Sequence, residues 1–333
     1  MSGVAALVGL VGVGCGGTTR TVSVREPATV SGSSAAAVER QFVAVVRQVQ
    51  PEVAQIRTDS GLGSGVIFDA KGDIVTNAHV VAGARSLSVT LADGRRFPAR
   101  LVGSYVPDDL AVVSIGSGHG LNPATFADSS KVDVGDLVLA VGNPLGLQSS
   151  VTDGIVSGVG RDVSEGQGVV LPNAIQTSAA INPGNSGGAL VDLEGRVIGI
   201  PTLAASNPQI GGTAAGIGFA IPSNVVTDIA GQIVGKGRVV SSHRAALGVS
   251  LADNPAETGA VVAAVQSGGP AAKAGIGVGD TIEAINGKRV TSVDDLATAL
   301  AAMAPGEKVT VMVARPDGTT STRTVTLGQL PGT

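Results

Sequence analysis

The 333-residue chain contains a single cysteine, no tryptophan, one tyrosine and five phenylalanines. One cysteine cannot form an intrachain disulfide, and it cannot supply a cysteine-based zinc site. Charged residues make up only 14% of the chain and hydrophobic residues 43%. This excludes an intrinsically disordered chain, because disorder requires low hydrophobicity and high net charge. The core must therefore be built from Val, Leu, Ile and Ala.

The chain also has no cluster of Lys and Arg, and its formal net charge is −4, so we expect no nucleic-acid partner. The three histidines, His79, His119 and His243, lie far apart without metal-ligand spacing. We therefore expect no metal and no cofactor. Residues 12–17 match G-x-G-x-x-G, but a nucleotide site requires a helix after that motif, and a linker-like or strand-like segment follows here.

An apolar run at residues 4–14 ends at Cys15 and is too short for the roughly 20 residues of a membrane-spanning helix. It predicts a signal- or lipobox-like segment over residues 1–15, with Cys15 as the lipidation candidate. Simple secretion, a truncated anchor and a cytosolic chain are the alternatives. Residues 16–34, rich in Ser, Thr, Gly and Pro, predict a flexible linker. We expect an exported protein, in the periplasm, cell envelope or medium.

The 49 glycines follow no Gly-X-Y period, which excludes collagen; their scatter among Val-rich segments predicts short strands joined by tight turns. Apolar spacing predicts a helix from Ser34 to just before Pro51. The predicted strands that follow are residues 65–68, 73–76, 86–91, 110–115 and 137–141. Such closely spaced short strands favour an antiparallel barrel or sandwich over βαβ units.

A second domain is predicted near the C-terminus, after a helical stretch over residues 223–234. It has strands of its own at residues 259–265, 309–314 and 321–327, and a helix at residues 293–303 with Asp294 and Asp295 in its first turn, where the helix dipole favours acids. The expected division is a first domain over residues 35–235, a linker over 236–244 and a second domain over 245–330.

The strongest local signal for chemistry is Asn-Pro-Gly-Asn-Ser-Gly-Gly-Ala-Leu at residues 182–190. Flanking glycines let the backbone turn sharply and leave the Ser186 hydroxyl accessible. Backbone N–H groups of Gly184, Asn185 and Ser186 form the candidate oxyanion hole, with those of Gly184 and Ser186 able to point at one spot. A hairpin turn in a Gly-rich protein is the alternative.

A hydroxyl nucleophile needs a general base. His79 directly follows a predicted strand and is the candidate, with a buried core histidine as the alternative; His119 and His243 are expected to be surface residues. The imidazole in turn needs an acid, and Asp108 and Asp109 precede a predicted buried strand, although either could be an ordinary strand-end residue. The order His79, Asp109, Ser186 is that of chymotrypsin-type enzymes.

Together these segments resemble the HtrA (DegP/DegS-like) serine proteases; the residues that carry the resemblance are 63–66, 76–81, 109–112, 142–144, 176–177, 182–188 and 218–222. The resemblance implies a mainly β fold, a chymotrypsin-like double β-barrel followed by a small α/β PDZ domain. It assigns His79 as general base, Asp109 as the orienting acid and Ser186 as nucleophile. Asp109 is preferred to Asp108 because the family's acid directly precedes the Leu-Ala-Val strand.

Residues 245–330 resemble a PDZ domain, in which Ala246, Leu247, Gly248 and Val249 align with the loop that binds a peptide's terminal carboxylate. A PDZ-like spacer is the alternative. Segments 161–172 and 203–212, rich in Gly, Ser or polar residues, are expected to be easily disordered loops that control the active site. Control by such loops is expected because Asn185 cannot form the ion pair with a newly cut N-terminus that the Asp at this position forms in the trypsin branch.

The function implied by the resemblance is a serine endopeptidase of envelope protein quality control, which cleaves unfolded or misfolded proteins under control of the PDZ domain. The family also implies a homotrimer. Ile181 and Ile200 are candidate walls of the specificity pocket, and without an acid at residues 178–182 we expect cleavage after small aliphatic residues. The alternative is a catalytically silent chaperone or scaffold that binds peptide C-termini.

Overall fold

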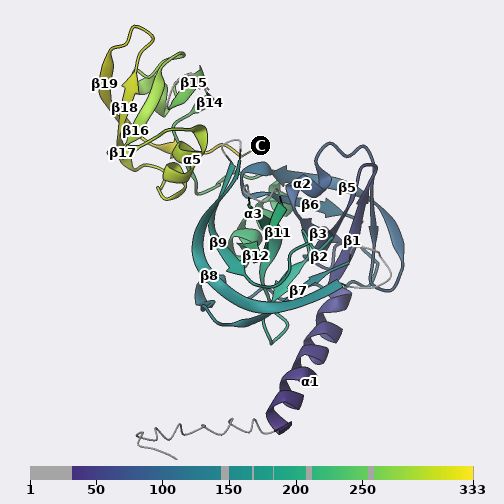
Figure 1. The fold of residues 1–333 in the computed structure, drawn as a ribbon. Helices are drawn as coiled ribbons and strands as arrows, with labels where there is room; N and C mark the ends of the chain where they lie inside the picture. The colour runs from purple at the N-terminus through teal and green to yellow at the C-terminus, as the bar shows by residue number, and fades with distance from the viewer. Residues whose placement is uncertain are drawn as a thin grey trace, which may run out of the picture. The chain divides into compact units, whose positions relative to one another are not determined.

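The computed structural model describes residues 32–143, 150–166, 169–182, 184–207, 212–253 and 259–332. Cys15, the whole predicted segment 1–15 and most of the predicted linker 16–34 lie outside these ranges. The described chain is mainly β, as predicted, with its strands gathered into two barrels, a six-stranded sheet and a two-stranded sheet (Figure 1). Among the described helices, none is long and apolar enough to cross a membrane.

The first barrel closes in the order β1-β2-β3-β6-β5-β4. Its strands are β1 (Val53–Thr58), β2 (Leu62–Ile67), β3 (Asp73–Thr76), β4 (Leu87–Thr90), β5 (Arg96–Tyr105) and β6 (Leu110–Ser114). Adjacent strands run antiparallel, and every residue of β3 and β6 is buried. Two short segments leave this barrel toward the site: α2 (Ala78–Val81) after β3 and η2 (Val106–Asp108) before β6.

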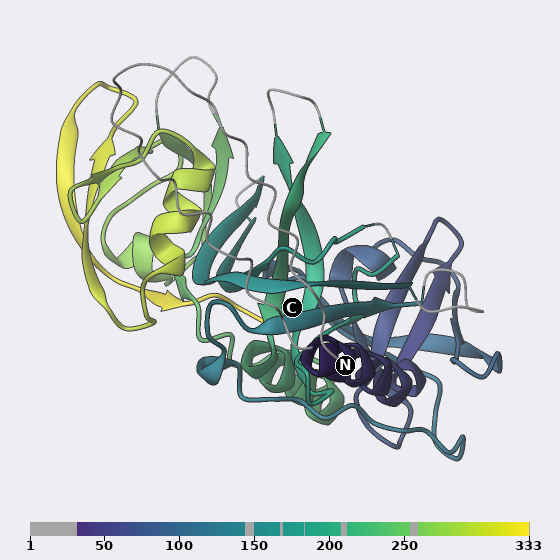
Figure 2. The same cartoon turned by 60° about the horizontal axis from the view of Figure 1, so that its bottom comes forward.

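The second barrel closes in the order β10-β11-β12-β9-β8-β7. Its strands are β7 (Leu137–Gly142), β8 (Ser150–Gly166), β9 (Val169–Thr177), β10 (Ala189–Val191), β11 (Val197–Asn207) and β12 (Gly212–Pro222), after the short η3 (Ser129–Lys131). The loops expected at residues 161–172 and 203–212 are wrong for the described residues, which are almost all paired in the long hairpins β8–β9 and β11–β12 (Figure 2).

The predicted helices at 34–50 and 223–234 are confirmed as α1 (Gly32–Val49), which η1 (Gln50–Glu52) follows, and α3 (Ser223–Lys236). Gly237 follows the last residue of α3, and its φ of 71° is the left-handed conformation typical of a helix C-terminus. Both helices contribute to one core cluster with side chains of both barrels, including Val75 and Leu110 from the first and Ile200 from the second. This shared apolar core holds the two barrels in contact, so residues at their junction have fixed positions.

The C-terminal part contains a mixed α and β unit with its own core, which includes Leu247, Ile282 and Leu296. Its elements are β13 (Ala245–Ala246), β14 (Val249–Asp253), β15 (Ala260–Val265), α4 (Pro270–Lys273), β16 (Thr281–Ile285), β17 (Lys288–Arg289), α5 (Val293–Ala301), β18 (Lys308–Ala314), β19 (Thr320–Thr326) and β20 (Gly328–Gln329). The strands and the helix predicted here are confirmed. α5 begins as expected, since the hydroxyl of Ser292 caps it by accepting from the N–H of Asp295.

Candidate active site

His79 lies in α2 and is held by Asp109 through two contacts. Its Nδ1 is 2.8 Å from Asp109 Oδ2, and its backbone N–H donates to Asp109 Oδ1 at 2.9 Å. The His79 side chain is 49% exposed, whereas that of Asp109 is 5% exposed. A buried carboxylate therefore holds the Nδ1 edge of a half-exposed imidazole, which is the arrangement of a general base and its orienting acid.

Asp109 reaches this position because the backbone turns sharply between η2 and β6. Its φ of 48° places it in the left-handed region, which Asp tolerates better than most residues. The turn is held because the Asp109 carbonyl accepts from the N–H of Ala78 at 3.0 Å and from Nδ2 of Asn77 at 3.1 Å. The segment carrying His79 and the segment carrying Asp109 are thus bound to each other by backbone as well as side chain.

Thr202 of β11 completes the surroundings of the acid, and sequence reasoning did not identify it. Its hydroxyl, in a residue 3% exposed, donates to Asp109 Oδ2 at 2.5 Å. The same oxygen faces His79 Nδ1. A charge-assisted hydrogen bond from a buried hydroxyl stabilises the ionised carboxylate and fixes its direction. The contact joins residues 93 positions apart, so no local motif could indicate it.

Ser186 lies on the loop before β10, and this loop is docked against the first barrel. The Ser186 carbonyl accepts from the N–H of Ser64 in β2 at 3.0 Å. Gly187 has a φ of 79°, and a Cβ there would lie 2.3 Å from the Ser64 carbonyl oxygen and 2.5 Å from Oγ1 of Thr76. Only glycine allows the loop to approach β2 and β3 so closely, and Thr76 is three residues before His79.

The oxyanion-hole candidates differ in their hydrogen bonds. The N–H of Asn185 donates to the Asn182 carbonyl at 3.1 Å, so it is already used, whereas the N–H groups of Gly184 and Ser186 donate to no other described residue. The Gly184 carbonyl accepts from the hydroxyl of Ser64 at 2.5 Å, and that hydroxyl accepts from the N–H of Asn143 at 2.7 Å. These contacts fix the peptide between Gly184 and Asn185, which lies between the two peptides that bear the N–H groups of Gly184 and Ser186.

The two candidate pocket residues do not share one wall. Ile181 is 7% exposed and packs with Ala179, Leu190 and Ile198 inside the second barrel. Ile200 is fully buried in the core cluster that α1 and α3 share with both barrels. Gly218 of β12 lies directly against Ile181, since a Cβ there would be 2.3 Å from Ile181 Cγ1. Of the two candidates, Ile181 is the one that directly precedes the loop that bears Ser186.

The carboxylate-loop candidates line a groove in the C-terminal unit. A cavity of about 470 Å³ lies between β14 and α5, and residues 246–249 are among those that line it. Gly248 has a φ of 73°, a conformation that favours glycine. The loop is braced because the Gly248 carbonyl accepts from Gln266 N–H and the Leu247 carbonyl from Ala271 N–H, both at 2.9 Å. Val293 and Leu300 make the groove apolar.

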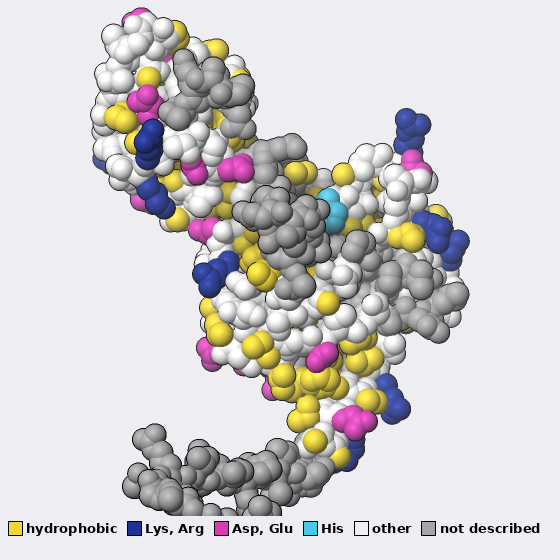
Figure 3. Space-filling view, in the orientation of Figure 1, with side chains coloured by type: hydrophobic (Ala, Val, Ile, Leu, Met, Phe, Trp, Pro, Cys, Tyr) yellow, Lys and Arg dark blue, Asp and Glu magenta, His cyan; other side chains and the backbone are white. Residues whose placement is uncertain are grey.

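The other histidines lie away from this constellation. The His119 ring packs on Phe97, with centroids 4.2 Å apart, and the His243 side chain is 72% exposed beside Asp228. Within the described ranges, no group of three or more His, Cys, Asp or Glu side chains could hold a metal ion. On the visible face in Figure 3, charged side chains of both signs are scattered, and the described part of that face has no broad basic patch.

The fold and this site define a class. Residues 63–200 match the family described as "Trypsin-like peptidase domain", and residues 245–327 match the family described as "PDZ domain". The chain therefore combines a trypsin-like peptidase domain with one PDZ domain within the matched residues. The "Serine protease Do-like HtrA" of Lactococcus lactis is 42% identical over 295 residues, which cover 81% of this chain and 71% of that protein.

A solved structure, "HtrA-type protease AlgW with decapeptide", has a TM-score of 0.60 and 35% identity, with 87% of this chain and 99% of that chain covered. The chain belongs to the HtrA family of serine proteases. "Periplasmic pH-dependent serine endoprotease DegQ" of Escherichia coli is 43% identical over 257 residues, or 75% of this chain. The match covers 55% of DegQ, so the chain spans about half the length of this curated relative.

Proposed function

We propose that the protein is a serine endopeptidase that works through His79, Asp109 and Ser186. His79 removes the proton of the Ser186 hydroxyl, and the oxygen attacks the peptide carbonyl carbon. The same imidazole then gives the proton to the leaving amine, and a water repeats the sequence to release the acyl group. The observation that carries this proposal is the 2.8 Å contact of His79 Nδ1 with buried Asp109 Oδ2, beside a docked serine loop.

The developing negative charge would be held by the N–H groups of Gly184 and Ser186. Both lie on the loop whose carbonyls are bound by Ser64, so these donors need little reorganisation during the reaction. Asn185 is not expected to donate, because its N–H is bound to Asn182. Asp109 would remain ionised and stabilise the imidazolium that forms, assisted by the hydroxyl of Thr202.

We propose unfolded or misfolded proteins as substrates, cleaved after small aliphatic residues. The support for small aliphatic residues is Ile181 beside the serine loop and Gly218 against it, with no acidic side chain at residues 178–182 to attract Lys or Arg. Fragments of digested casein, sequenced by mass spectrometry, test the specificity. Cuts concentrated after Lys or Arg would contradict it.

We propose that the PDZ domain binds peptide C-termini and raises the activity. Residues 246–249 line an apolar groove, and backbone N–H groups beside such a groove are what capture of a carboxylate and an apolar side chain requires. Peptides with a free apolar C-terminus should raise the turnover of a separate substrate, and their amidated versions should not. Equal stimulation by both forms would remove carboxylate capture from the mechanism.

We further propose domain boundaries at 35–235 for the protease and 245–330 for the PDZ domain, an exported location, and a homotrimer, all of which follow the family pattern. Cys15 is proposed as a lipid-anchor site. Sedimentation of the purified protein tests the trimer. The mass of the N-terminal peptide from cell membranes tests lipidation, since an acylated Cys15 would begin the mature chain.

Hydrolysis of casein by the wild type beside Ser186→Ala tests the central proposal. The wild type should digest casein and the variant should not, with unchanged circular dichroism. The second candidate, a catalytically silent scaffold that binds peptide C-termini, is favoured only by the groove of the PDZ domain. It would be supported if neither protein cut casein while both bound a C-terminal peptide.

A further inference from the structure

Asp108, the residue next to the proposed triad acid, is not an ordinary exposed strand-end residue. Its side chain is 4% exposed and pairs with the guanidinium of Arg244 at 2.8 Å. The same guanidinium donates to the carbonyl of Pro107 and, at 2.7 Å, to the carbonyl of Val170 in β9. Arg244 therefore ties the η2 turn of the first barrel to a strand of the second.

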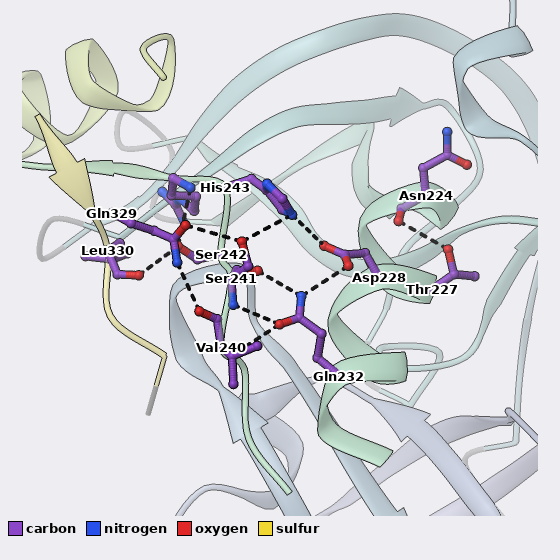
Figure 4. Close-up of polar contacts among 11 residues, drawn as sticks. Asn224, Thr227, Asp228, Gln232, Val240, Ser241, Ser242, His243, Gln329 and Leu330 are labelled. Atoms are coloured by element: carbon purple, nitrogen blue, oxygen red, sulfur yellow. Dashed lines mark hydrogen bonds and ion pairs between the residues drawn. The ribbon is translucent and has the colours of Figure 1, made fainter. Parts of the chain in front are cut away.

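The segment that delivers Arg244 follows a fixed path along α3. Figure 4 shows Gln232 of α3 bound to this segment: its Oε1 accepts from the N–H groups of Val240 and Ser241, both at 2.9 Å, and its Nε2 donates to the Ser241 carbonyl at 2.8 Å. Asp228 lies 3.6 Å from His243 in the same view. These contacts hold the residues just before Arg244, so the position from which its side chain extends is fixed before the chain enters β13.

The η2 turn determines where Asp109 points. The N–H of Asp109 donates to the carbonyl of Val106 at 2.9 Å, and Asp109 itself has the left-handed φ of 48°. A non-glycine residue in that region persists only where its surroundings hold it. Two of the three groups that accept from the Arg244 guanidinium belong to Pro107 and Asp108, the residues between that turn's first member and Asp109.

We propose that Arg244 is a positioning residue for the triad: by clamping Pro107 and Asp108 it holds the η2 turn, and through it the carboxylate of Asp109 that orients His79. This proposal rests on the proposed peptidase function. Since Arg244 immediately precedes β13 and its carbonyl accepts from the N–H of Leu330 at 2.7 Å, the clamp lies at the entrance to the PDZ domain.

Burial and the neighbouring charges explain why the carboxylate of Asp108 is paired with Arg244. Burial raises the pKa of Asp108, and the carboxylate of Asp228 raises it too, whereas Arg244 lowers it. Tyr105, whose pKa is raised by its own burial, also faces this pair. The pKa of Asp108 is raised overall, and Arg244 opposes that rise; loss of either partner removes the opposite charge that pairs with the other beside the triad.

The test compares Asp108→Asn and Arg244→Lys with the wild type in the full-length protein. Asn nearly preserves the shape of Asp, and Lys preserves the charge of Arg without its planar set of donors. Arg238→Ala is the matched control, because Arg238 is an exposed arginine of the same linker. kcat and KM for a peptide chosen from casein cleavage sites are measured across pH, with competent sites counted by a serine-directed inhibitor.

Both variants should lower kcat per competent site about tenfold or more and leave KM within about twofold, since small misplacements of catalytic groups cost rate rather than ground-state binding. Asp108→Asn should also move the acid limb of kcat/KM to lower pH, because the unpaired guanidinium disfavours the protonated imidazole. Arg238→Ala should match the wild type.

Three results would overturn the proposal: kcat in both variants equal to that of Arg238→Ala, a loss expressed only in KM, or a loss explained entirely by fewer competent sites with the acid limb unmoved. A wild type that cuts no peptide bond contradicts the peptidase function instead. The two failures are therefore distinguishable.

Discussion

Glu52 should make the folded protein less stable as the pH rises from 5 to 8. It lies in η1, between the fully buried residues Val49 and Val53, and its own side chain is 8% exposed. Its Oε2 atom has no hydrogen-bond partner among the described residues. Burial of this carboxyl raises its pKa from 4.5 to about 7, because a low-dielectric environment disfavours the charged form.

Proton linkage gives the direction in which the stability changes with pH. A folded-state pKa above the unfolded value means that the folded protein binds this proton more tightly, so the carboxyl favours folding least when it is ionised. This loss of folding free energy is absent below about pH 4.5 and grows as the pH rises through 7. It reaches at most about 3 kcal/mol, because each unit of difference between the folded and unfolded pKa is worth about 1.4 kcal/mol. Glu52→Gln removes the ionisation, so it should be the more stable protein at pH 8.

Urea unfolding of wild type and Glu52→Gln at several pH values between 5 and 8 measures this difference. The gap between the two free energies of unfolding should widen toward pH 8 by on the order of 1–3 kcal/mol. Glu39→Gln, which changes an exposed carboxylate of α1, should show no such widening. A gap that is constant with pH, or that widens toward pH 5, would refute the assignment of a buried, uncompensated carboxyl.

Two further substitutions test how the site is held. Thr202→Val should lower kcat about ten- to a hundredfold with little change in melting temperature. It removes the hydroxyl bound to Asp109, and a hydrogen bond to a charged group is worth about 1.5–3 kcal/mol. An undiminished kcat would exclude a role of this hydroxyl in holding Asp109. Gly187→Ala should abolish casein digestion, since its Cβ would meet Ser64 and Thr76. Gly160→Ala, at a φ of 66° with open space around it, should keep the activity. An active Gly187→Ala would contradict the close docking of the Ser186 loop on the first barrel.

Hydrophobic periodicity predicted the helices and some of the strands. The helices at residues 34–50, 223–234 and 293–303 and the first-barrel strands β2, β3, β4 and β6 lie within a few residues of their predicted bounds, whereas β1 and β5 were not predicted. Composition misled at residues 161–172 and 203–212. Gly and Ser favour loops locally, but cross-strand pairing with a neighbour in the sheet overrides that preference, and no single segment carries that information.

The residues of the site also fall into those that the sequence predicted and those that it did not. His79, Asp109 and Ser186 stand in recognisable local patterns, and their residue types suit the chemistry. Thr202 and Arg244 act on that site from positions 93 and 136 residues away from their partners, so only the folded chain brings them together. Ile200 illustrates the limit of reasoning from apolar character alone, because the pleat of β11 turns it into the core.

Identification of the residue that a serine-directed phosphonate modifies would test the central claim most directly. In a wild-type preparation that digests casein, the adduct should lie on Ser186, because His79 removes the proton of that hydroxyl, and it should be absent from Ser186→Ala and greatly reduced in His79→Ala. An adduct that persists in Ser186→Ala, or full labelling of Ser186 in His79→Ala, would contradict a nucleophile activated by His79.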